Sequence, residues 1–408
     1  MFIYDLAINI LPAGVKLLAC FKEKEKKLVN GQKDVFSYLE QNIDQKASYI
    51  WFHASSLGEF EQGRPMIEKI KKELPDSKII LTFFSPSGYE VRKNYPLADL
   101  ICYLPFDTKS NVNRFLNIVN PQKAIFIKYE FWLNYLEALH KRGIPTYIIS
   151  AIFRSRQLFF KPHGGWYRRM LHYFNHLYLQ DQNSKQLLNS IGIEQVTVCG
   201  DTRFDRVIDI KNQAKEIPLI ESFAQDQKVL IAGSSWAKDE DIFIDYFNKR
   251  ENIKLIIAPH EIHESHLKEI ESKLKRPFKR FSQLDSSEIQ NTDCIIIDCF
   301  GMLSSIYRYG NVAYIGGGFG TGIHNILEAA VYGMPVIWGP NYAKFREAKD
   351  LIKAGGGFSI TDKDEFNACC DRFFTDSAYL KETNTKAYQY VANNAGATDI
   401  IYADLFNK

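Results

Sequence analysis

The feature that most constrains the fold of this chain is an alternation of short apolar, β-rich runs with longer helical stretches, which begins after residue 47. The runs are SYIWFHA, SKIILTFF, DLICYLPF, QKAIFIKY and PTYIIS in the first half, and KVLIAGSS, KLIIAPHE, DCIIIDCF, NVAYIGGG and MPVIWGP in the second. They start roughly every 20 to 30 residues, which is too far apart for hairpins and suits the helical crossovers that join parallel strands. Each half therefore predicts a parallel sheet wound with helices.

The length and composition fit two such sheets in one soluble chain. The 408 residues are 46% hydrophobic and 24% charged, which excludes disordered, collagen-like and many-helix membrane proteins. Because one domain usually takes about 100 to 200 residues, two domains are expected. The predicted fold class is α/β, with two doubly wound Rossmann-like domains that face a cleft. Ligands of such sheets bind beyond the carboxyl ends of the strands, so we expect functional residues in the loops that follow the apolar runs.

The domain boundaries are predicted where this alternation weakens. It weakens around DIKNQAKEIP, which places the junction between about Gly200 and Gln227. We expect one domain over 28–205 and a second over 206–390. Residues 391–408 are predicted to form a helix that packs back on the body, because its aromatic and aliphatic residues need an apolar partner.

Charge and cysteine usage exclude several classes of protein. The 51 basic residues nearly balance the 48 acidic ones, so the chain has no overall positive field to hold nucleic acid, and no nucleic-acid partner is expected. The seven cysteines include no CxxC pair, which argues against a disulfide framework and a cysteine zinc site. A reducing cytoplasm fits this pattern best.

Residues 1–27 are predicted to associate with a membrane. The stretch 1–21 is rich in apolar residues, but Asp5, Pro12 and Lys16 interrupt a run that needs about 20 apolar residues to cross a bilayer. The charged run KEKEKK follows it, as expected for a segment that lies at a membrane interface. The alternative is a hydrophobic helix docked on the protein's own N-terminal domain.

The segment YIGGGFGTGIHNILEAAVYGMP, residues 314–335, predicts a phosphate-binding loop. A strand leads into five glycines, and a helix is expected to begin near Ile323, so glycine backbone and helix N–H groups would face an anion. It is not a P-loop, because no Gly-Lys-Ser/Thr follows. Glu328 is a candidate for binding ribose hydroxyls. The alternatives are a glycine turn made only for packing and a solvated Glu328.

The segment HASSLGE places Glu59 directly after the first predicted strand. At the mouth of the predicted cleft this carboxylate is a candidate catalytic group. Ser56 and Glu59 also fit the S-x-x-E capping box, in which the glutamate only caps the helix. A helix N-terminus favours the charged form, so we expect Glu59 to be ionised at cytoplasmic pH.

Other first-domain strand ends carry further polar candidates. Glu130, in IFIKYEFWLNY, would position an acceptor or a basic side chain, and the alternative is a structural ion pair with Lys128 or Arg154. Ser85 and Ser87, in TFFSPSGYE, offer hydroxyls, and the alternative is a turn with a helix N-cap.

Residues 153–170, FRSRQLFFKPHGGWYRRM, mix basic and aromatic side chains. This composition suits a phosphorylated amphiphile at a membrane surface, with Arg154 and Arg156 among its charges. The alternative is a solvated basic helix. In HEIHESH, His260 is predicted to face a nucleotide, while the three histidines lack the H-E-x-x-H spacing, so no metal site is expected.

Taken together, these segments make the chain similar to the transferases of 3-deoxy-D-manno-octulosonic acid (Kdo) in lipopolysaccharide synthesis. The similarity rests on HASSLGE, SPSGYE, KYEFWLNY, GDTRFD, APHE and GGGFGTGIHNILEAA, and covers nearly the whole chain. It implies a GT-B architecture, an inverting mechanism without metal or other cofactor, CMP-Kdo as donor and a lipid A precursor as acceptor. It also implies a location at the cytoplasmic face of the bacterial inner membrane.

The resemblance also implies roles for individual residues. Glu59 would be the general base. The acceptor would be bound by Ser56, Gly58, Ser85, Ser87, Glu130, Arg154 and Arg156. The donor would be bound by Arg203, His260, Gly301, Gly318, Gly320, Gly322, His324, Asn325 and Glu328.

Three positions depart from the usual family pattern. His260 stands where the family usually has arginine after the proline of its APRH block, and Arg203 stands where it commonly has lysine. The block GML at Gly301 replaces the usual GEL.

Two other classes of function stay open from the sequence. One is a sugar-nucleotide epimerase of the non-hydrolysing type, or another GT-B sugar transferase. The other is a non-catalytic protein that binds lipid A or a sugar nucleotide. The apolar N-terminus argues against the epimerase, and the presence of both a carboxylate and a glycine loop argues against a non-catalytic protein.

Overall fold

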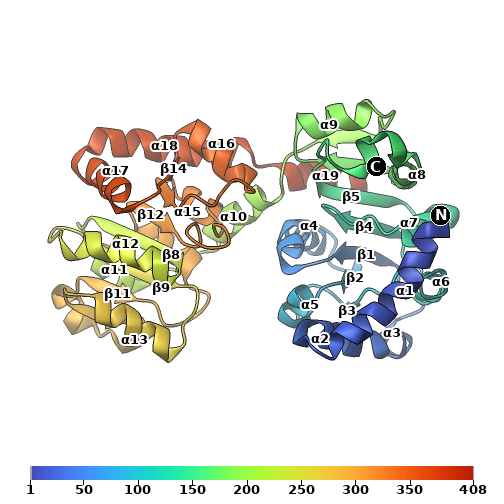
Figure 1. The fold of residues 1–408 in the computed structure, drawn as a ribbon, viewed down its shortest axis with the longest axis horizontal. Helices are drawn as coiled ribbons and strands as arrows, with labels where there is room; N and C mark the ends of the chain where they lie inside the picture. Colours follow the sequence, from blue (N-terminus) through green and yellow to red (C-terminus); the bar gives the residue numbers. More distant parts are fainter. Residues whose placement is uncertain (1, 408) are drawn as a thin grey trace. The chain divides into compact units, whose positions relative to one another are not determined.

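The computed structural model describes residues 2–407, with side chains from Tyr4 onward. The chain forms two compact units (Figure 1). The first unit comprises the residues up to Arg206 together with those from Ala395 onward, and the second runs from Val207 to Asn394. Helix α10 (Arg203–Asn212) runs across the boundary.

The first unit is built on a parallel seven-stranded sheet in the order β3-β2-β1-β4-β5-β6-β7. Its strands are β1 (Tyr49–Ala54), β2 (Lys78–Phe83), β3 (Leu100–Tyr103), β4 (Lys123–Ile127), β5 (Thr146–Ala151), β6 (His176–Leu179) and β7 (Val196–Val198). Its other helices are α1 (Phe2–Ala19), α2 (Glu23–Lys33), α3 (Val35–Asn42), α4 (Leu57–Glu73), α5 (Pro86–Arg92), α6 (Lys109–Val119), α7 (Leu133–Lys141), α8 (Gly165–Arg168), α9 (Gln182–Asn189) and α19 (Ala397–Phe406).

The second unit has its own parallel seven-stranded sheet in the order β10-β11-β9-β8-β12-β13-β14. Its strands are β8 (Val229–Ser235), β9 (Lys254–Pro259), β10 (Phe278–Arg280), β11 (Cys294–Ile296), β12 (Val312–Ile315), β13 (Val336–Trp338) and β14 (Gly357–Ser359). Its helices are α11 (Pro218–Ala224), α12 (Ala237–Asn248), α13 (Glu264–Lys273), α14 (Leu303–Ile306), α15 (Leu327–Ala330), α16 (Arg346–Ala354), α17 (Lys363–Thr375) and α18 (Ser377–Asn393).

These two sheets confirm the predicted class of two doubly wound α/β domains. All ten apolar runs form strands, because a strand of a parallel sheet is buried on both faces and must be apolar along its length. Strands β6, β7, β10 and β14 were not predicted from the sequence. All four are only three or four residues long, and β7, β10 and β14 lie at the edges of their sheets, so their apolar signal is weak.

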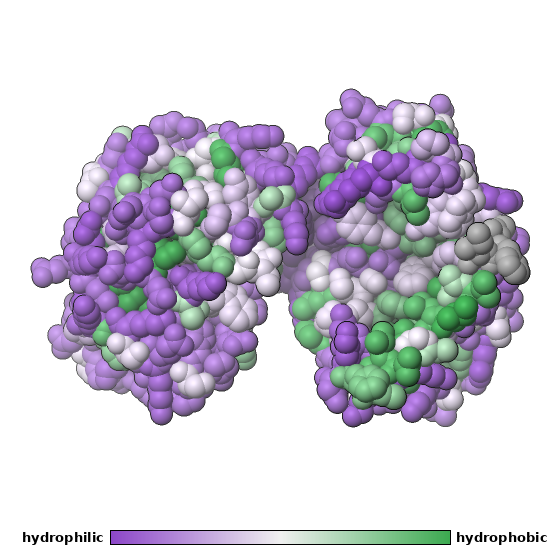
Figure 2. Space-filling model, in the orientation of Figure 1, coloured by the Kyte–Doolittle hydropathy of each residue, from purple (hydrophilic) through white to green (hydrophobic). Residues whose placement is uncertain are grey.

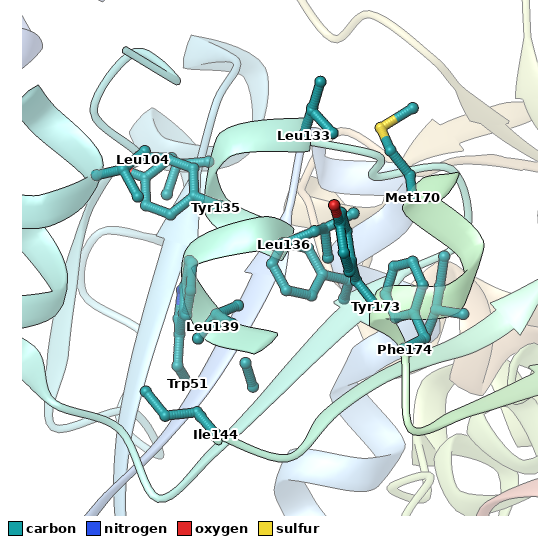
Figure 3. Close-up of a cluster of buried hydrophobic side chains, with 14 of the residues drawn as sticks. Trp51, Leu104, Leu133, Tyr135, Leu136, Leu139, Ile144, Met170, Tyr173 and Phe174 are labelled. Atoms are coloured by element: carbon teal, nitrogen blue, oxygen red, sulfur yellow. The ribbon is translucent and has the colours of Figure 1, made fainter. Parts of the chain in front are cut away.

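The core of the first unit lies between its sheet and the helices that cover it. Trp51 of β1 is fully buried, and its ring lies 5.0 to 5.4 Å from the rings of Phe115, Phe126 and Tyr135. Figure 3 shows how Leu136 and other side chains of α7 point into the same cluster. This packing fixes β1 and β4, whose carboxyl ends lead into the segments of Glu59 and Glu130.

Helix α1 is held on the first unit by its N-terminal part. The Tyr4 hydroxyl donates to Asp107 Oδ2 over 2.6 Å, and Asp5 pairs with Lys109 over 2.7 Å. Along the rest of the helix Leu6, Ile10, Leu17 and Leu18 stay exposed, and Figure 2 shows a band of hydrophobic residues there. The docked alternative thus describes the N-terminal part of this helix, and membrane association stays a prediction. Among residues 2–407, no helix combines the length and apolarity that a bilayer crossing requires.

The C-terminal helix α19 packs on the first unit. Asp205 caps its start by accepting hydrogen bonds from the backbone N–H groups of Gly396 and Thr398, over 2.5 and 2.7 Å. Tyr178 donates to Asp404 over 2.6 Å farther along the helix. The last aspartate of the GDTRFD segment therefore has a structural role that the sequence analysis did not predict.

Candidate functional site

In the first unit the most informative group is the carboxylate of Glu59, at the start of α4. Strand β1 ends at Ala54, and the turn that follows aims two backbone N–H groups at Glu59 Oε2, from Ser55 at 2.6 Å and from Ser56 at 3.2 Å. The glutamate thus does reach back to the N-cap as the capping box predicts. The capping geometry also holds the carboxylate in one place.

The electrostatic surroundings of Glu59 differ from those predicted. Burial and the negative charge of Glu130 raise the pKa of Glu59 to about 7, against the opposing effects of the two N–H donors and the charge of Lys128. The expectation that the helix N-terminus sets the pKa of this carboxylate is therefore wrong, since desolvation outweighs the helix dipole here. A carboxyl with a pKa near neutrality is well matched to proton transfer at cellular pH.

Glu130, which follows β4, is buried and accepts two hydrogen bonds. The donors are Trp132 Nε1 at 2.6 Å and His53 Nε2 at 3.0 Å. On the other side of its ring, His53 Nδ1 lies 2.9 Å from the hydroxyl of Thr82. His53 and Trp132 were not predicted as site residues, because His53 lies inside a strand and Trp132 reads as an ordinary core aromatic.

Three predicted arginines lie in the same electrostatic environment as Glu59. The pKa of Tyr129 is raised by burial, and the charges of Arg154, Glu59, Arg203 and Arg156 all act on it. Arg154 and Arg156 are exposed, whereas Arg203 binds Asp201 through Nη2 over 2.9 Å. The first unit thus brings together acidic and basic groups from the loops after β1, β4, β5 and β7.

The backbone under this group is locally strained and braced. Lys128 adopts a φ of 66° and Ser150 a φ of 51°, in the left-handed region that non-glycine residues rarely enter. The Ser150 hydroxyl lies 2.8 Å from that of Thr202, which in turn donates to the carbonyl of Gln62 in α4. These bonds tie the GDTRFD segment to the helix that carries Glu59.

Ser85 and Ser87 form the N-cap turn of α5, as the alternative interpretation predicted. Ser85 Oγ accepts from the Ser87 backbone N–H over 3.3 Å, and the two hydroxyls are 3.0 Å apart. The Ser85 N–H donates to the Ser55 carbonyl over 2.7 Å. The serine turn therefore borders the Glu59 turn, where Gly58 is exposed and has open space around its Cα.

The basic aromatic segment is a chain of short helical turns rather than one helix. It contains three-residue 3₁₀ turns at Leu158–Phe160 and Pro162–Gly164, followed by the four-residue α8. Arg168 donates to the carbonyls of Phe159 and Lys161 over 2.6 and 2.8 Å, so this arginine braces the turns.

In the second unit the glycine segment follows β12, as predicted, but its helix does not begin near Ile323. Helix α15 starts at Leu327 and is one turn long. The preceding N–H groups bond within the loop: those of Gly320 and Gly322 donate to the Gly317 carbonyl over 3.0 and 3.1 Å. A helix dipole is therefore a weaker source of positive charge here than the sequence analysis assumed.

The glycines of this loop differ in what the structure requires of them. A Cβ on Gly316 would collide with the backbone of Ser234, and one on Gly318 with the backbone of Gly339, so these two allow close packing. Gly322 has a φ of 138°, which side chains rarely tolerate. At Gly320, which is exposed, a Cβ would meet only the Gly317 carbonyl oxygen at 3.5 Å, an ordinary contact, so packing does not require a glycine here. The packing alternative thus accounts for part of the loop only.

Asn325 and Glu328 lie together at the end of the loop. Asn325 Nδ2 donates to Glu328 Oε1 over 2.9 Å, and Asn325 Oδ1 accepts from the Leu327 N–H over 3.2 Å. Gly301, another predicted donor residue, has a φ of 85° in the loop after β11.

Beside the glycine loop, Trp236, His260 and His324 form a stack of rings that the sequence analysis did not predict. The His260 ring lies 4.4 Å from the ring of His324 and 4.6 Å from that of Trp236. Trp236 Nε1 donates to His324 Nε2 over 3.1 Å. Burial and the charge of His260 lower the pKa of His324 to about 4, so this ring is neutral at cellular pH.

The HEIHESH segment places Glu261, His263 and His266 close enough to hold a metal ion, but His266 is already engaged. Its Nε2 binds buried Glu240 over 3.0 Å, and its Nδ1 lies 3.0 Å from the Glu261 carbonyl. A metal ligand needs a free nitrogen lone pair, so this cluster does not fit an ion.

Comparisons with known proteins agree with the motif resemblance. Residues 30–206 match the family model of the 3-deoxy-D-manno-octulosonic-acid transferases. The transferase of that name from Aquifex aeolicus is 28% identical over 327 residues, which cover 78% of this chain and 83% of that protein. The one from Chlamydia muridarum is 28% identical over 371 residues, covering 86% and 84%.

A solved structure supports the fold assignment. UDP-GlcNAc 2-epimerase from Neisseria meningitidis superposes with a TM-score of 0.63 at 17% identity, covering 88% of this chain and all of that one. At this identity the likeness concerns the fold, which is the GT-B type of paired doubly wound domains.

Proposed function

Because this chain is related to the Kdo transferases, we propose that it moves Kdo from CMP-Kdo to a sugar hydroxyl of a lipid A precursor, with inversion. The observation that carries the proposal is Glu59, a fixed carboxylate whose pKa is raised to about 7 within a cluster of acidic and basic groups. We assign no step of the proposed reaction to a metal ion or other cofactor.

Glu59 acts as the general base. It takes the proton of the acceptor hydroxyl while that oxygen forms a bond to the anomeric carbon of Kdo, and the bond from this carbon to the CMP phosphate oxygen breaks on the opposite face. An alcohol is a weak nucleophile at neutral pH, whereas CMP leaves as a stabilised anion, so the acceptor is the partner that needs activation.

The remaining groups of the first unit bind the acceptor. The exposed guanidinium groups of Arg154 and Arg156 suit the phosphates of a lipid A precursor, because arginine binds phosphate through paired hydrogen bonds. Ser56, Gly58, Ser85 and Ser87 border Glu59 and offer hydroxyls and backbone groups to the sugar. Glu130 tunes the pKa of Glu59 through its charge.

The second unit binds CMP-Kdo. The exposed position at Gly320 and the loop around Gly318 and Gly322 accommodate the phosphate, with His260 and His324 beside it. The Asn325–Glu328 pair binds the ribose. Gly301 completes the donor contacts proposed for this unit, and Arg203, which belongs to the first unit, is a further proposed donor residue.

One reaction separates this function from the two other classes. The full chain is incubated with CMP-Kdo and a tetraacylated glucosamine disaccharide bisphosphate, and the lipid is analysed by mass spectrometry. Addition of Kdo to the lipid is expected. An epimerase would leave both substrates unchanged and would convert a UDP-sugar in a parallel incubation, whereas a binding protein would convert none of the three.

Replacing Glu328 by alanine is expected to weaken CMP binding by about tenfold to hundredfold, because lost hydrogen bonds to a charged acceptor cost about 1.5 to 3 kcal/mol. Calorimetry with CMP measures this. Glu382→Ala on α18, an exposed glutamate of the same unit, is the control. An unchanged dissociation constant for Glu328→Ala would remove this residue from the donor site.

The exposed face of α1 is proposed to hold the protein at the cytoplasmic face of the inner membrane. The double variant Leu17→Ser, Phe21→Ser changes one residue of α1 and one that lies two positions beyond its end. It removes side chains that are 67% and 82% exposed and leaves the contacts of Tyr4 intact. We expect binding to anionic vesicles to fall at least about tenfold, since burying each such side chain contributes about 1.5 to 3 kcal/mol.

Sedimentation with vesicles measures this loss. The control is Tyr388→Ser, Ile400→Ser, which removes side chains that are 49% and 48% exposed on other helices. Equal losses in the two double variants would show that α1 has no special part in membrane binding.

A further inference from the structure

The ring stack in the second unit is built into the frame that also holds the glycine loop. Near the end of strand β8, Ser234 has a φ of 53°, and Trp236 then leads from the strand into α12. Asp239 Oδ2 accepts from the backbone N–H groups of both Trp236 and Gly317, over 3.0 and 2.8 Å. One buried carboxylate therefore fixes Trp236 relative to the loop.

His324 is fixed in the same frame from the other side. Its backbone N–H donates to the Gly316 carbonyl over 3.2 Å. A Cβ on Gly317 would lie 3.2 Å from His324 Cδ2, so the Cδ2 edge of the ring packs against this glycine. The neighbouring Nε2 is the atom that Trp236 reaches, which leaves Nδ1 on the opposite edge of the ring.

The hydrogen bond from Trp236 decides where the ring proton of His324 lies. An indole nitrogen is a donor only, so His324 Nε2 must accept and carry no hydrogen. In a neutral imidazole the single proton is then on Nδ1. A protonated ring would set N–H against N–H, and stacked His260 further disfavours a positive charge on His324.

We propose that Trp236 is a positioning residue that holds His324 in its neutral Nδ1–H form, so that the ring offers one directed N–H donor to the phosphate of the sugar-nucleotide donor. This assignment of the ligand rests on the proposed function. The tautomer of His324 does not, because it follows from contacts within the free protein.

The variant Trp236→Phe tests this role because it keeps an aromatic ring in the stack and removes the N–H donor. Nitrogen-15 NMR of histidine side chains reports the protonation of each ring nitrogen. In the parent without ligand, His324 is expected to show a protonated Nδ1 and a bare Nε2, and to stay neutral down to a pKa of about 4. Exposed His163 and His172 serve as references in the same spectrum.

In Trp236→Phe the proton is expected to redistribute toward Nε2, and the pKa of His324 to rise above its parental value, because no N–H group then opposes a proton on Nε2. Unchanged reference signals and an unchanged melting temperature show that the variant is folded. A parent His324 protonated on Nε2, or a folded variant with the parental tautomer, would overturn the positioning role.

Binding measurements identify the group that the Nδ1–H meets. Trp236→Phe is expected to weaken CMP binding about tenfold and to leave cytidine binding unchanged, because only CMP carries the phosphate. Equal losses for both ligands would contradict the phosphate contact and indicate that Trp236 supports the base instead. If the parent binds neither ligand, the proposed function fails while the tautomer result is decided by NMR alone.

Discussion

Replacing Glu59 by glutamine is expected to lower the turnover of Kdo transfer by about a hundredfold to ten-thousandfold, which is the usual contribution of general-base catalysis. Glutamine has the size of glutamate, and its side-chain oxygen still accepts from the N–H groups of Ser55 and Ser56. The substitution thus removes the base and keeps the cap. Steady-state turnover with the lipid acceptor, together with CMP calorimetry, measures the effect.

The capping alternative predicts a different result. If Glu59 only caps α4, the variant should turn over almost normally, because glutamine keeps the cap. The control is Glu73→Gln, an exposed glutamate at the far end of the same helix. Turnover of Glu59→Gln within about threefold of the parent would end the catalytic assignment.

The raised pKa of Glu59 also fixes the sign of its effect on stability. The folded protein holds this proton up to a pH of about 7, whereas the unfolded chain releases it near 4.5. Stability is therefore lost as the pH rises from about 4.5 to about 7, and it stays at this lower level above that range. At pH 8 we expect Glu59→Gln to melt no lower than the parent, because the neutral side chain avoids burying a charge.

Much of the fold was predictable because the strands of parallel sheets are recognisable in the sequence as apolar runs. Trp51 and its neighbours in β1 are such a case, since every residue of the strand is buried. Strand β10, by contrast, has the sequence FKR and is half-buried, and it pairs only with β11 at the sheet edge. Its pairing comes from tertiary context, which no local pattern carries.

The position of Glu59 could be predicted from the sequence, but its pKa could not. The position of Glu59 after a strand follows from the sequence. Its raised pKa depends on Glu130, which lies 71 positions later in the sequence and is brought near only by the pairing of β1 with β4. The partners His53 and Trp132 are hidden for the same reason, because each reads locally as a core residue.

The start of α15 shows a local limit of prediction. Asn325 accepts from the Leu327 N–H and so forms its own turn, which delays the helix by four residues relative to the predicted start at Ile323. Asparagine side chains compete with the helix in this way wherever they precede it. The close approaches of Gly316 and Gly318 to distant backbone likewise become visible only in the folded chain.

The pH dependence of transfer is expected to show an acidic limb with an inflection near the pKa of Glu59, about 7. A general base must be unprotonated, so kcat/KM should rise with pH through this range and level off above it. Below the inflection the rate falls about tenfold per pH unit, which amounts to about a hundredfold at pH 5. A profile flat from pH 5 to pH 8 would contradict an essential carboxyl with a raised pKa.

Glu130→Gln is expected to move this limb to lower pH. The charge of Glu130 is the second cause of the raised pKa, after burial, so a neutral side chain at this position makes Glu59 easier to ionise. With its side-chain oxygen in the place of Glu130 Oε2, glutamine can still accept from both Trp132 and His53 Nε2, which preserves the geometry of the buried pair. Relative to its own plateau, the variant should therefore retain more activity at pH 6 than the parent does.

The measurement is a kcat/KM profile from pH 5 to pH 9 for the parent, Glu130→Gln and the control Glu73→Gln. The acidic limb of Glu73→Gln should match that of the parent. If Glu130→Gln abolishes transfer at every pH while Glu59→Gln stays active, the two carboxylates exchange roles and Glu130 is the base.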